Sequence, residues 1–160
     1  MTQETETRIT AEMRATIGRE GAPVRHEVDK TSIRMFARAV GHTDLIYYDE
    51  DYAKSNGHRG IVAPPAYLGT TIFNPNNQPP GPGAPGADGR RRLGMNGGSE
   101  YEYTGVEICA GDVLTAVSKT VSIDERRSSM GLMVITRRES VYTNQNGEVV
   151  CRAYGTGLQF

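Results

Sequence analysis

The sequence predicts a single α+β domain built on one antiparallel sheet. Two observations support this prediction. Helix signals are confined to the part of the chain that ends at Phe73, whereas β-type alternation fills the part after Met95. A chain of 160 residues is also long enough to form one domain with its own core. No internal repeat divides it further.

The chain begins with a polar stretch. We assign residues 1–16 as a polar N-terminal tail, in which residues 11–17 form a short helical turn ending at Gly18. Residues 23–28 alternate loosely between apolar and polar side chains, which is typical of a short strand. The rest of the chain, residues 17–160, is then one domain.

The first clear helix follows Asp29, whose side chain is suited to cap a helix that begins at Lys30. Its apolar residues fall at the i, i+3, i+4 and i+7 spacing of one helical face; they are Ile33, Phe36, Ala37 and Val40. Gly41 then supplies the C-terminal residue that accepts a left-handed backbone. The pattern therefore predicts a helix packed on the core by one stripe.

Two more helices are expected before the strands begin. Residues 49–56 form a short one, capped by Asp49 or Asp51. A third begins at Pro64 and Pro65, where missing N–H groups are no loss, and runs to Phe73. The tract 74–89 contains five prolines and four glycines and cannot continue a helix. We interpret it as a surface loop, with a flap over a ligand mouth as the alternative.

The last third of the chain predicts strands separated by turns. Strands are expected over 99–104, 113–123, 129–144 and 148–160. The pair Asn146-Gly147 lies between the last two and is typical of a two-residue hairpin turn. The order of strand, helices and then antiparallel strands supports the α+β class.

Composition excludes several functions. The net charge of −1 gives no general attraction to nucleic acid or to an anionic membrane. The N-terminus is too polar for a signal peptide, and no run reaches the roughly 18 apolar residues of a membrane span. We interpret the three arginines at 90–92 as the solvent-exposed edge of a loop. The alternative is that they bind a phosphate group of acyl-CoA.

Metal and cysteine chemistry is also unsupported. Cys109 and Cys151 lack the spacing of metal ligands, as do the histidines and carboxylates. We expect both cysteines to be buried free thiols in a reducing compartment, the cytoplasm. A pairing between them stays open.

Two blocks of the sequence carry a resemblance to a known family. The stretch 36–70, which reads FARAVGHTDLIYYDEDYAKSNGHRGIVAPPAYLGT, and the later GGSEYEY at 97–103 with Ala110-Gly111-Asp112 resemble the MaoC-like hydratases and dehydratases. The resemblance is in particular to the FAS1-like dehydratase branch, which includes the non-catalytic subunits of mycobacterial 3-hydroxyacyl-thioester dehydratases. The resemblance covers roughly residues 17–159. It implies a hot-dog fold, a curved antiparallel sheet wrapped around a central helix.

The resemblance also implies a chemistry. Adding water to an enoyl thioester requires acid–base groups and N–H donors for the developing enolate oxygen. Active members of the family carry a block that resembles Gly-Asp-x-Asn-Pro-x-His, whose aspartate and histidine form the acid–base pair. A glycine at the start of their central helix offers its N–H to the thioester oxygen. In this chain Gly41 matches the glycine, but His42 stands at the aspartate, Asp44 at the asparagine and Tyr47 at the histidine. Pro65 falls near the helix-start glycine.

These departures affect all three catalytic functions. An unperturbed tyrosine has a pKa of about 10, and proline has no N–H, so an oxyanion site would have to use Ala66. We therefore predict an acyl-binding, non-catalytic half that requires a catalytic MaoC-type partner in a heterodimer or heterotetramer. His42, Asp44 and Tyr47 are the candidate catalytic positions. Tyr48, Pro65, Ala66 and Tyr67 are the candidate substrate-binding residues.

Two alternatives remain open. The chain could be a self-sufficient homodimeric hydratase that uses His42 with Asp44 or Tyr47, or a non-enzymatic acyl-thioester binding protein. His42 could instead only cap the preceding helix, and each tyrosine could serve only packing. No prosthetic group is implied, because the substrate arrives as a thioester of CoA or of an acyl carrier protein.

Overall fold

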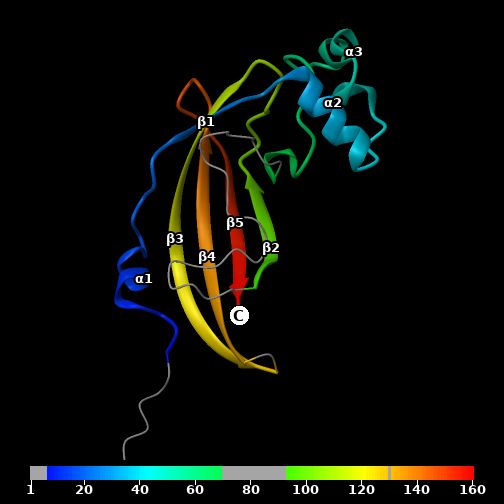
Figure 1. Cartoon of the computed structure of the whole chain (residues 1–160). Coiled ribbons are helices and arrows are strands. Elements are labelled where there is room, and N and C mark those ends of the chain that lie inside the picture. The colour runs from blue at the N-terminus through cyan, green and yellow to red at the C-terminus, as the bar shows by residue number, and fades with distance from the viewer. Residues whose placement is uncertain (1–6, 70–92, 130) are drawn as a thin grey trace, which may run out of the picture.

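A curved five-stranded antiparallel sheet forms the body of the molecule (Figure 1). The computed structural model describes residues 7–69, 93–129 and 131–160. The strands are β1 (Val24–Glu27), β2 (Gly94–Tyr103), β3 (Val113–Ser128), β4 (Gly131–Thr143) and β5 (Val149–Gln159). The helices are α1 (Ala11–Ala15), α2 (Lys30–Ala39) and α3 (Glu50–Ser55), with short 3-10 helices η1 (Leu45–Tyr47) and η2 (Tyr67–Gly69).

The strand order in the sheet is β1-β3-β4-β5-β2, with every neighbouring pair antiparallel. The predicted strands are therefore all present, although β2 and β3 are longer than the sequence pattern suggested. The strand β2 pairs only with β5 among the described residues, so it forms one edge of the sheet. Its ten residues make this edge much longer than the four-residue β1 at the other side.

The prediction of a two-residue turn between β4 and β5 is wrong. The N–H of Asn144 donates to the carbonyl of Glu148 at 2.9 Å, which leaves three residues, 145–147, in the loop. Gly147 occupies the left-handed region at φ +82°, as a three-residue hairpin with a glycine bulge requires. The Asn144 side chain favours this wider turn because its oxygen accepts the N–H groups of Asn146 and Glu148, both at 3.0 Å.

The helix α2 begins and ends as predicted. One carboxylate oxygen of Asp29 accepts the N–H groups of Thr31 and Ser32, both at 2.9 Å. At the other end Gly41 adopts φ +81°. The N–H of His42 then donates to the carbonyl of Ala37 at 2.9 Å, and that of Gly41 donates to Arg38 at 3.3 Å. This pair of bonds is the Schellman arrangement, and it determines where the chain leaves the helix.

The prediction of a third helix starting at Pro64 and Pro65 is wrong in its first turn. Ala66 has φ +65°, a left-handed conformation that cannot lie inside an α-helix. The described chain makes a turn there and then the 3-10 helix η2. The remainder of the predicted helix, the loop 74–89 and the arginines at 90–92 lie outside the described residues.

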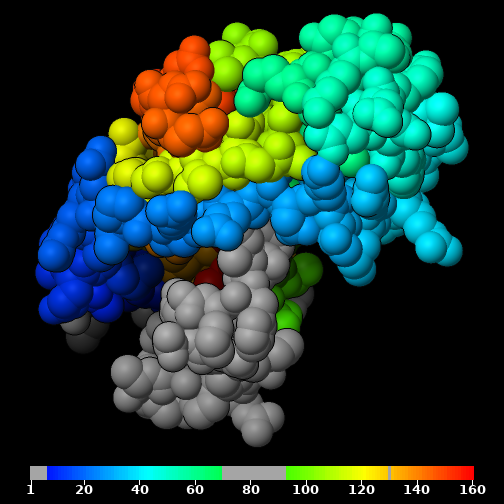
Figure 2. Space-filling model, turned by 90° about the horizontal axis from the view of Figure 1, so that it is seen from above, coloured from blue at the N-terminus to red at the C-terminus, as the bar shows by residue number. Residues whose placement is uncertain are grey.

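The main core lies at the end of the sheet that carries α2 and α3 (Figure 1). It joins the apolar stripe of α2 to the segment 61–68 and to the facing strand residues. Its fully buried members include Ile33, Ile61, Leu114 and Val150. Cys109 and Cys151 are buried free thiols, as predicted. Figure 2 looks down on this end, with α2 and α3 on one side and the β4–β5 turn on the other.

The N-terminal segment lies against the far part of β3. The Glu125 carboxylate accepts the Thr7 hydroxyl at 2.9 Å and the N–H of Ile9 at 3.0 Å. Ile9 is buried, so this part of the predicted tail contributes to packing. In the part of the chain that the structure describes, no helix combines the length and the apolar character needed to cross a membrane.

Candidate functional site

The structure brings two of the three candidate catalytic side chains together. The Schellman end of α2 directs the chain into His42, and η1 then presents Tyr47. The two rings lie 5.2 Å apart between centroids and are tilted by 46°. Burial raises the pKa of Tyr47, and the nearby Asp44 carboxylate raises it further. The Tyr47 hydroxyl is therefore neutral at physiological pH and poorly suited to act as a base.

Asp44 has a local structural contact. Its carboxylate accepts the N–H of Ile46 at 3.0 Å and caps η1. Within residues 7–69 and the described strands, no hydrogen bond joins Asp44 to His42. The Asp–His arrangement that a reversed acid–base pair would need is therefore not formed in this conformation.

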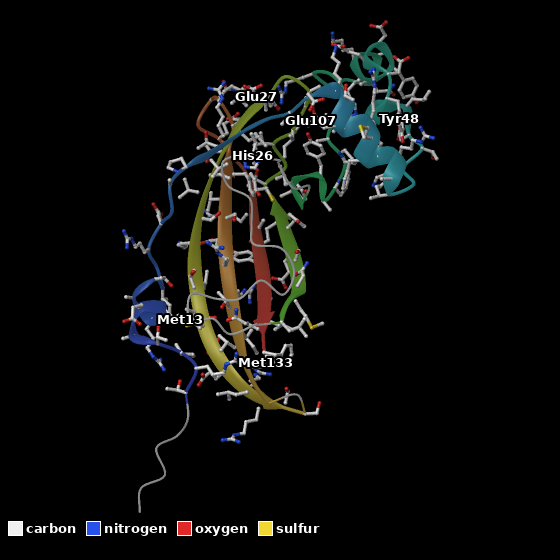
Figure 3. All side chains as sticks on the ribbon, in the orientation of Figure 1. Met13, His26, Glu27, Tyr48, Glu107 and Met133 are labelled. Atoms are coloured by element: carbon white, nitrogen blue, oxygen red, sulfur yellow. The ribbon has the colours of Figure 1, made fainter. Side chains whose placement is uncertain are left out.

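Tyr48 lies beside α2 and braces the loop that carries His42. Its hydroxyl donates to the carbonyl of His42 at 2.5 Å, and its own carbonyl accepts from Nε of Arg34 at 2.9 Å. Figure 3 shows Tyr48 and Glu107 at the same end of the molecule, near α2. Tyr48 thus holds the segment 42–48 against the helix.

A cleft of about 340 Å³ opens next to Tyr47. Its walls come from three segments that are distant in sequence: η1, the turn before η2, and the loop after β2. Most of its surface is apolar, and the polar side chains in it are Tyr47, Tyr103 and Glu107. The lining residues are Tyr47, Val62, Ala63, Pro65, Tyr103, Gly105, Val106, Glu107 and Ile108. Such a site suits a ligand with an apolar chain.

The predicted oxyanion donor is already engaged. The N–H of Ala66 donates to the Tyr103 hydroxyl at 2.9 Å. Tyr103 lies at the end of β2, 37 positions further along the chain. Pro65 precedes Ala66 and lines the cleft, but it has no N–H to offer. In this conformation the Ala66 N–H is therefore bonded to a phenol oxygen, where the family resemblance implied an open backbone amide.

Tyr67 belongs to the core. Its side chain is 7% exposed, and its hydroxyl lies 2.5 Å from the Ser32 hydroxyl of α2. Its ring meets Phe36 edge-on at a centroid distance of 6.0 Å. These contacts join η2 to α2, so Tyr67 fixes the position of the turn that holds Pro65 and Ala66.

A polar cluster supports the loop that forms the other wall of the cleft. The Asp112 carboxylate, 3% exposed, receives both terminal nitrogens of Arg59, at 3.0 and 2.8 Å. It also accepts the Cys109 N–H at 2.8 Å and the Gln145 side chain at 3.0 Å. Burial acts to raise the pKa of Asp112, but these donors outweigh it and hold the pKa below its usual value.

The neighbouring pair of His58 and Glu107 reinforces this support. Nδ1 of His58 contacts the Glu107 carboxylate, which also receives the Cys109 thiol at 3.8 Å. His58 lies in a turn between Gly57 and Gly60 and therefore ties that turn to the loop after β2. Among the described residues, no group of three or more His, Cys, Asp or Glu side chains is placed to hold a metal ion.

Sequence reasoning did not identify Tyr103, Glu107 or Arg59 as parts of this region. In the sequence, Tyr103 was noted only as the last residue of the run at 97–103 and was given no role of its own. Its alternation with Tyr101 places the two on one face of a strand, but nothing local shows that its hydroxyl reaches Ala66. The contacts of Tyr103 with Ala66 and of Arg59 with Asp112 join residues 37 and 53 positions apart.

The comparisons with known proteins agree with this architecture. The model of the FAS1-like dehydratase domain region matches residues 15–153. The fold is also that of the hot-dog dehydratases. One chain of the ChsH1–ChsH2 complex from Mycobacterium tuberculosis superposes with a TM-score of 0.67 at 20% identity, over 88% of this chain and 84% of that one. The predicted hot-dog class is confirmed, and the chain belongs to the FAS1-like dehydratase family.

Relatives of known sequence extend the comparison. A UPF0336 protein from Streptomyces avermitilis is 32% identical over 84% of this chain and 86% of its own length. A probable enoyl-CoA hydratase alpha subunit from Thermomonospora curvata is 28% identical over 92% of this chain. This chain spans half of that longer protein. The family assignment therefore holds over nearly the whole chain.

Proposed function

We propose that this chain is the acyl-binding, non-catalytic half of an (R)-3-hydroxyacyl-thioester dehydratase or enoyl-CoA hydratase. The observation that carries the proposal is the state of the acid–base positions and of the predicted oxyanion donor. His42 faces a neutral phenol, Asp44 caps η1, and the Ala66 N–H is bonded to Tyr103. Hydration of an enoyl thioester needs well-placed acid–base groups and a free oxyanion donor. A partner of MaoC type supplies both.

The cleft beside Tyr47 supports an acyl-binding role. The part of its lining that the structure describes is mostly apolar and contains no lysine or arginine. Each buried methylene of an acyl chain contributes about 0.8 kcal/mol by leaving water. A chain with a neutral thioester therefore gains free energy in this cleft. No prosthetic group is required, and the thioester carrier is CoA or an acyl carrier protein.

The open edge of the sheet supports the partner. Among the described residues β2 has no neighbour on its outer side, and an unpaired ten-residue strand edge favours pairing with another chain. Met95 on β2 is substantially exposed. The similarity to a subunit of the ChsH1–ChsH2 complex agrees with a heterodimer or heterotetramer. The cytoplasm, a reducing compartment, suits the two buried free thiols.

Co-expression tests the proposal. The partner is a hot-dog chain that contains an intact Gly-Asp-x-Asn-Pro-x-His block, ideally the product of a neighbouring gene. Crotonyl-CoA hydration is followed by the loss of enoyl absorbance for the complex and for each chain alone. We expect a stable complex whose activity exceeds that of either chain by at least two orders of magnitude, the usual scale of a lost acid–base group.

The contact between His42 and Tyr47 is compatible with one alternative, a homodimer that hydrates enoyl thioesters without a partner. In that case the purified chain would hydrate crotonyl-CoA, and His42→Ala would abolish turnover with the fold intact. Binding of acyl-CoA without turnover in any complex would instead identify a thioester-binding protein. Either result would replace the proposed partner-dependent role.

A further inference from the structure

The hydroxyl of Tyr103 has an unusual position at the end of β2. The strand is anchored there, because Thr104 donates its N–H to the Val150 carbonyl at 3.2 Å and its hydroxyl to the Val149 carbonyl at 2.7 Å. Tyr103 reaches from this fixed point across the cleft wall to the N–H of Ala66. Its phenol oxygen is therefore held by two separate parts of the fold.

The backbone that meets Tyr103 is strained. A non-glycine residue at φ +65° costs on the order of 1 kcal/mol or more. The turn is maintained by its surroundings: Ala63 donates its N–H to the Ile108 carbonyl at 2.8 Å, and Gly69 donates to the Ala66 carbonyl at 2.8 Å. Strain of this kind persists where the neighbouring structure imposes it, and it directs the Ala66 N–H at the phenol.

The Tyr103 hydroxyl keeps its own proton available. Its oxygen accepts from Ala66, and no residue in the described part of the chain accepts its proton. Burial raises the pKa of Tyr103 to about 12, so the phenol is neutral and a donor at physiological pH. Because hydrogen bonds in a chain polarise one another, the Ala66 N–H makes this hydroxyl a stronger donor.

The charged side chains around the cleft favour an uncharged ligand group over a carboxylate. Among the described residues, the lining holds one carboxylate, Glu107, and no lysine or arginine. The Glu107 carboxylate is engaged by His58 and by the Cys109 thiol. A ligand carboxylate would lie beside the Glu107 carboxylate, and no lysine or arginine of the described lining would pair with it. A neutral carbonyl oxygen attached to an apolar chain meets a donor from Tyr103 and apolar walls.

We propose that the Tyr103 hydroxyl donates a hydrogen bond to the carbonyl oxygen of an acyl thioester whose chain occupies the cleft. The Ala66 N–H acts through the phenol and does not contact the ligand. This inference rests on the proposed acyl-binding function and adds the residue that recognises the thioester. Tyr103 is thus a ligand-binding residue that fixes the position of the carbonyl.

The test uses hexanoyl-CoA labelled with ¹³C at the carbonyl, with the full chain alone and in complex with its catalytic partner. A donated hydrogen bond moves the carbonyl resonance downfield. We expect this shift on binding to the wild-type chain, its loss in Tyr103→Phe, and a roughly fivefold weaker Kd, the equivalent of one neutral hydrogen bond. Hexanoate should bind far more weakly than hexanoyl-CoA.

Tyr101→Phe is the matched control, because Tyr101 lies two positions earlier on the same face of β2 and outside the cleft lining. It should leave the carbonyl shift unchanged. Tyr103→3-fluorotyrosine keeps the ring and makes the hydroxyl a stronger donor, so the downfield shift should increase. Urea unfolding of each variant shows that the fold is intact.

The outcomes separate this inference from the proposed function. A downfield shift that persists in Tyr103→Phe, or a wild-type chain that binds no hexanoyl-CoA, overturns the role of Tyr103. If partner-dependent hydration occurs with an unchanged KM in Tyr103→Phe, the inference fails and the proposed function stands. If the shift depends on Tyr103 but no partner confers activity, the inference stands and the partner-dependent role fails.

Discussion

Replacement of Asp112 by asparagine should destabilise the protein strongly. The carboxylate is 3% exposed and accepts four hydrogen bonds, two of them from Arg59. In Asp112→Asn either orientation of the amide places its NH2 group against two of these donors. Hydrogen bonds to a charged group contribute about 1.5–3 kcal/mol each, so two of them represent about 3–6 kcal/mol.

The lower end of this range is the better expectation. The side chain of Arg59 is 53% exposed, so water can take over part of its hydrogen bonding once the carboxylate is gone. We expect a loss of about 3 kcal/mol in the free energy of unfolding. With a urea m-value of about 2 kcal/mol/M, the unfolding midpoint should fall by about 1.5 M.

Urea titration followed by circular dichroism measures this change. Asp124→Asn is the control, because Asp124 is an exposed strand residue for which a change within about 0.5 kcal/mol is expected. The reasoning is refuted if the midpoints of Asp112→Asn and Asp124→Asn coincide.

The contribution of Asp112 to the free energy of unfolding should decrease as the pH falls. Because the folded-state pKa of Asp112 is depressed, the unfolded chain binds more protons as the pH falls below about 4. The stabilisation is therefore complete above the unfolded pKa and is lost as the pH falls through the folded one. The difference between wild type and Asp112→Asn should shrink below pH 4. A difference that grows in acid would contradict the assignment.

Substitutions at three positions test local features, and a series of ligands tests the cleft. Asp29→Ala removes the acceptor for two N–H groups of α2 and should cost about 1 kcal/mol, a loss of about 2–4 °C in Tm. Ala66→Gly should leave the Tm unchanged or raise it, whereas Ala66→Pro, which cannot adopt φ +65° and lacks an N–H, should lower stability by about 3 kcal/mol. Gly147→Ala places a side chain at φ +82° and should cost about 1 kcal/mol; an unchanged Tm would argue against the glycine bulge. For the acyl cleft, each added methylene from butyryl-CoA to hexanoyl-CoA should tighten Kd about fourfold by calorimetry; a flat series would argue against acyl binding there.

The features predicted correctly depend on neighbouring residues. The start of α2 follows from one carboxylate two and three positions before the amides that it accepts. Its end follows from Gly41, a residue that accepts a left-handed backbone at low cost. The presence of the long strands, although not the full length of β2 and β3, follows from their alternation. These signals act over a few residues, so a single sequence carries them in full.

Local sequence patterns gave wrong predictions where specific hydrogen bonds stabilised a different backbone conformation. Asn146-Gly147 has the composition of a two-residue turn, but the Asn144 side chain satisfies two amides of a wider loop. Pro64 and Pro65 suit a helix start, but the hydrogen bonds of Ala63 and Tyr103 hold Ala66 in a left-handed turn. In both cases a specific hydrogen bond outweighed a general preference.

The sequence by itself determined the α+β class, the caps of α2 and the departure of His42, Asp44 and Tyr47 from the family pattern, because each depends on residue identity at short spacing. Tertiary structure alone decided that Tyr103 meets Ala66, that Arg59 meets Asp112, and that three distant segments enclose one cleft. The physical reason is that these contacts join segments 37 to 53 residues apart, which meet only in the folded chain. A hydroxyl and an amide 37 residues apart have no local preference for each other, so only the folded chain specifies their meeting.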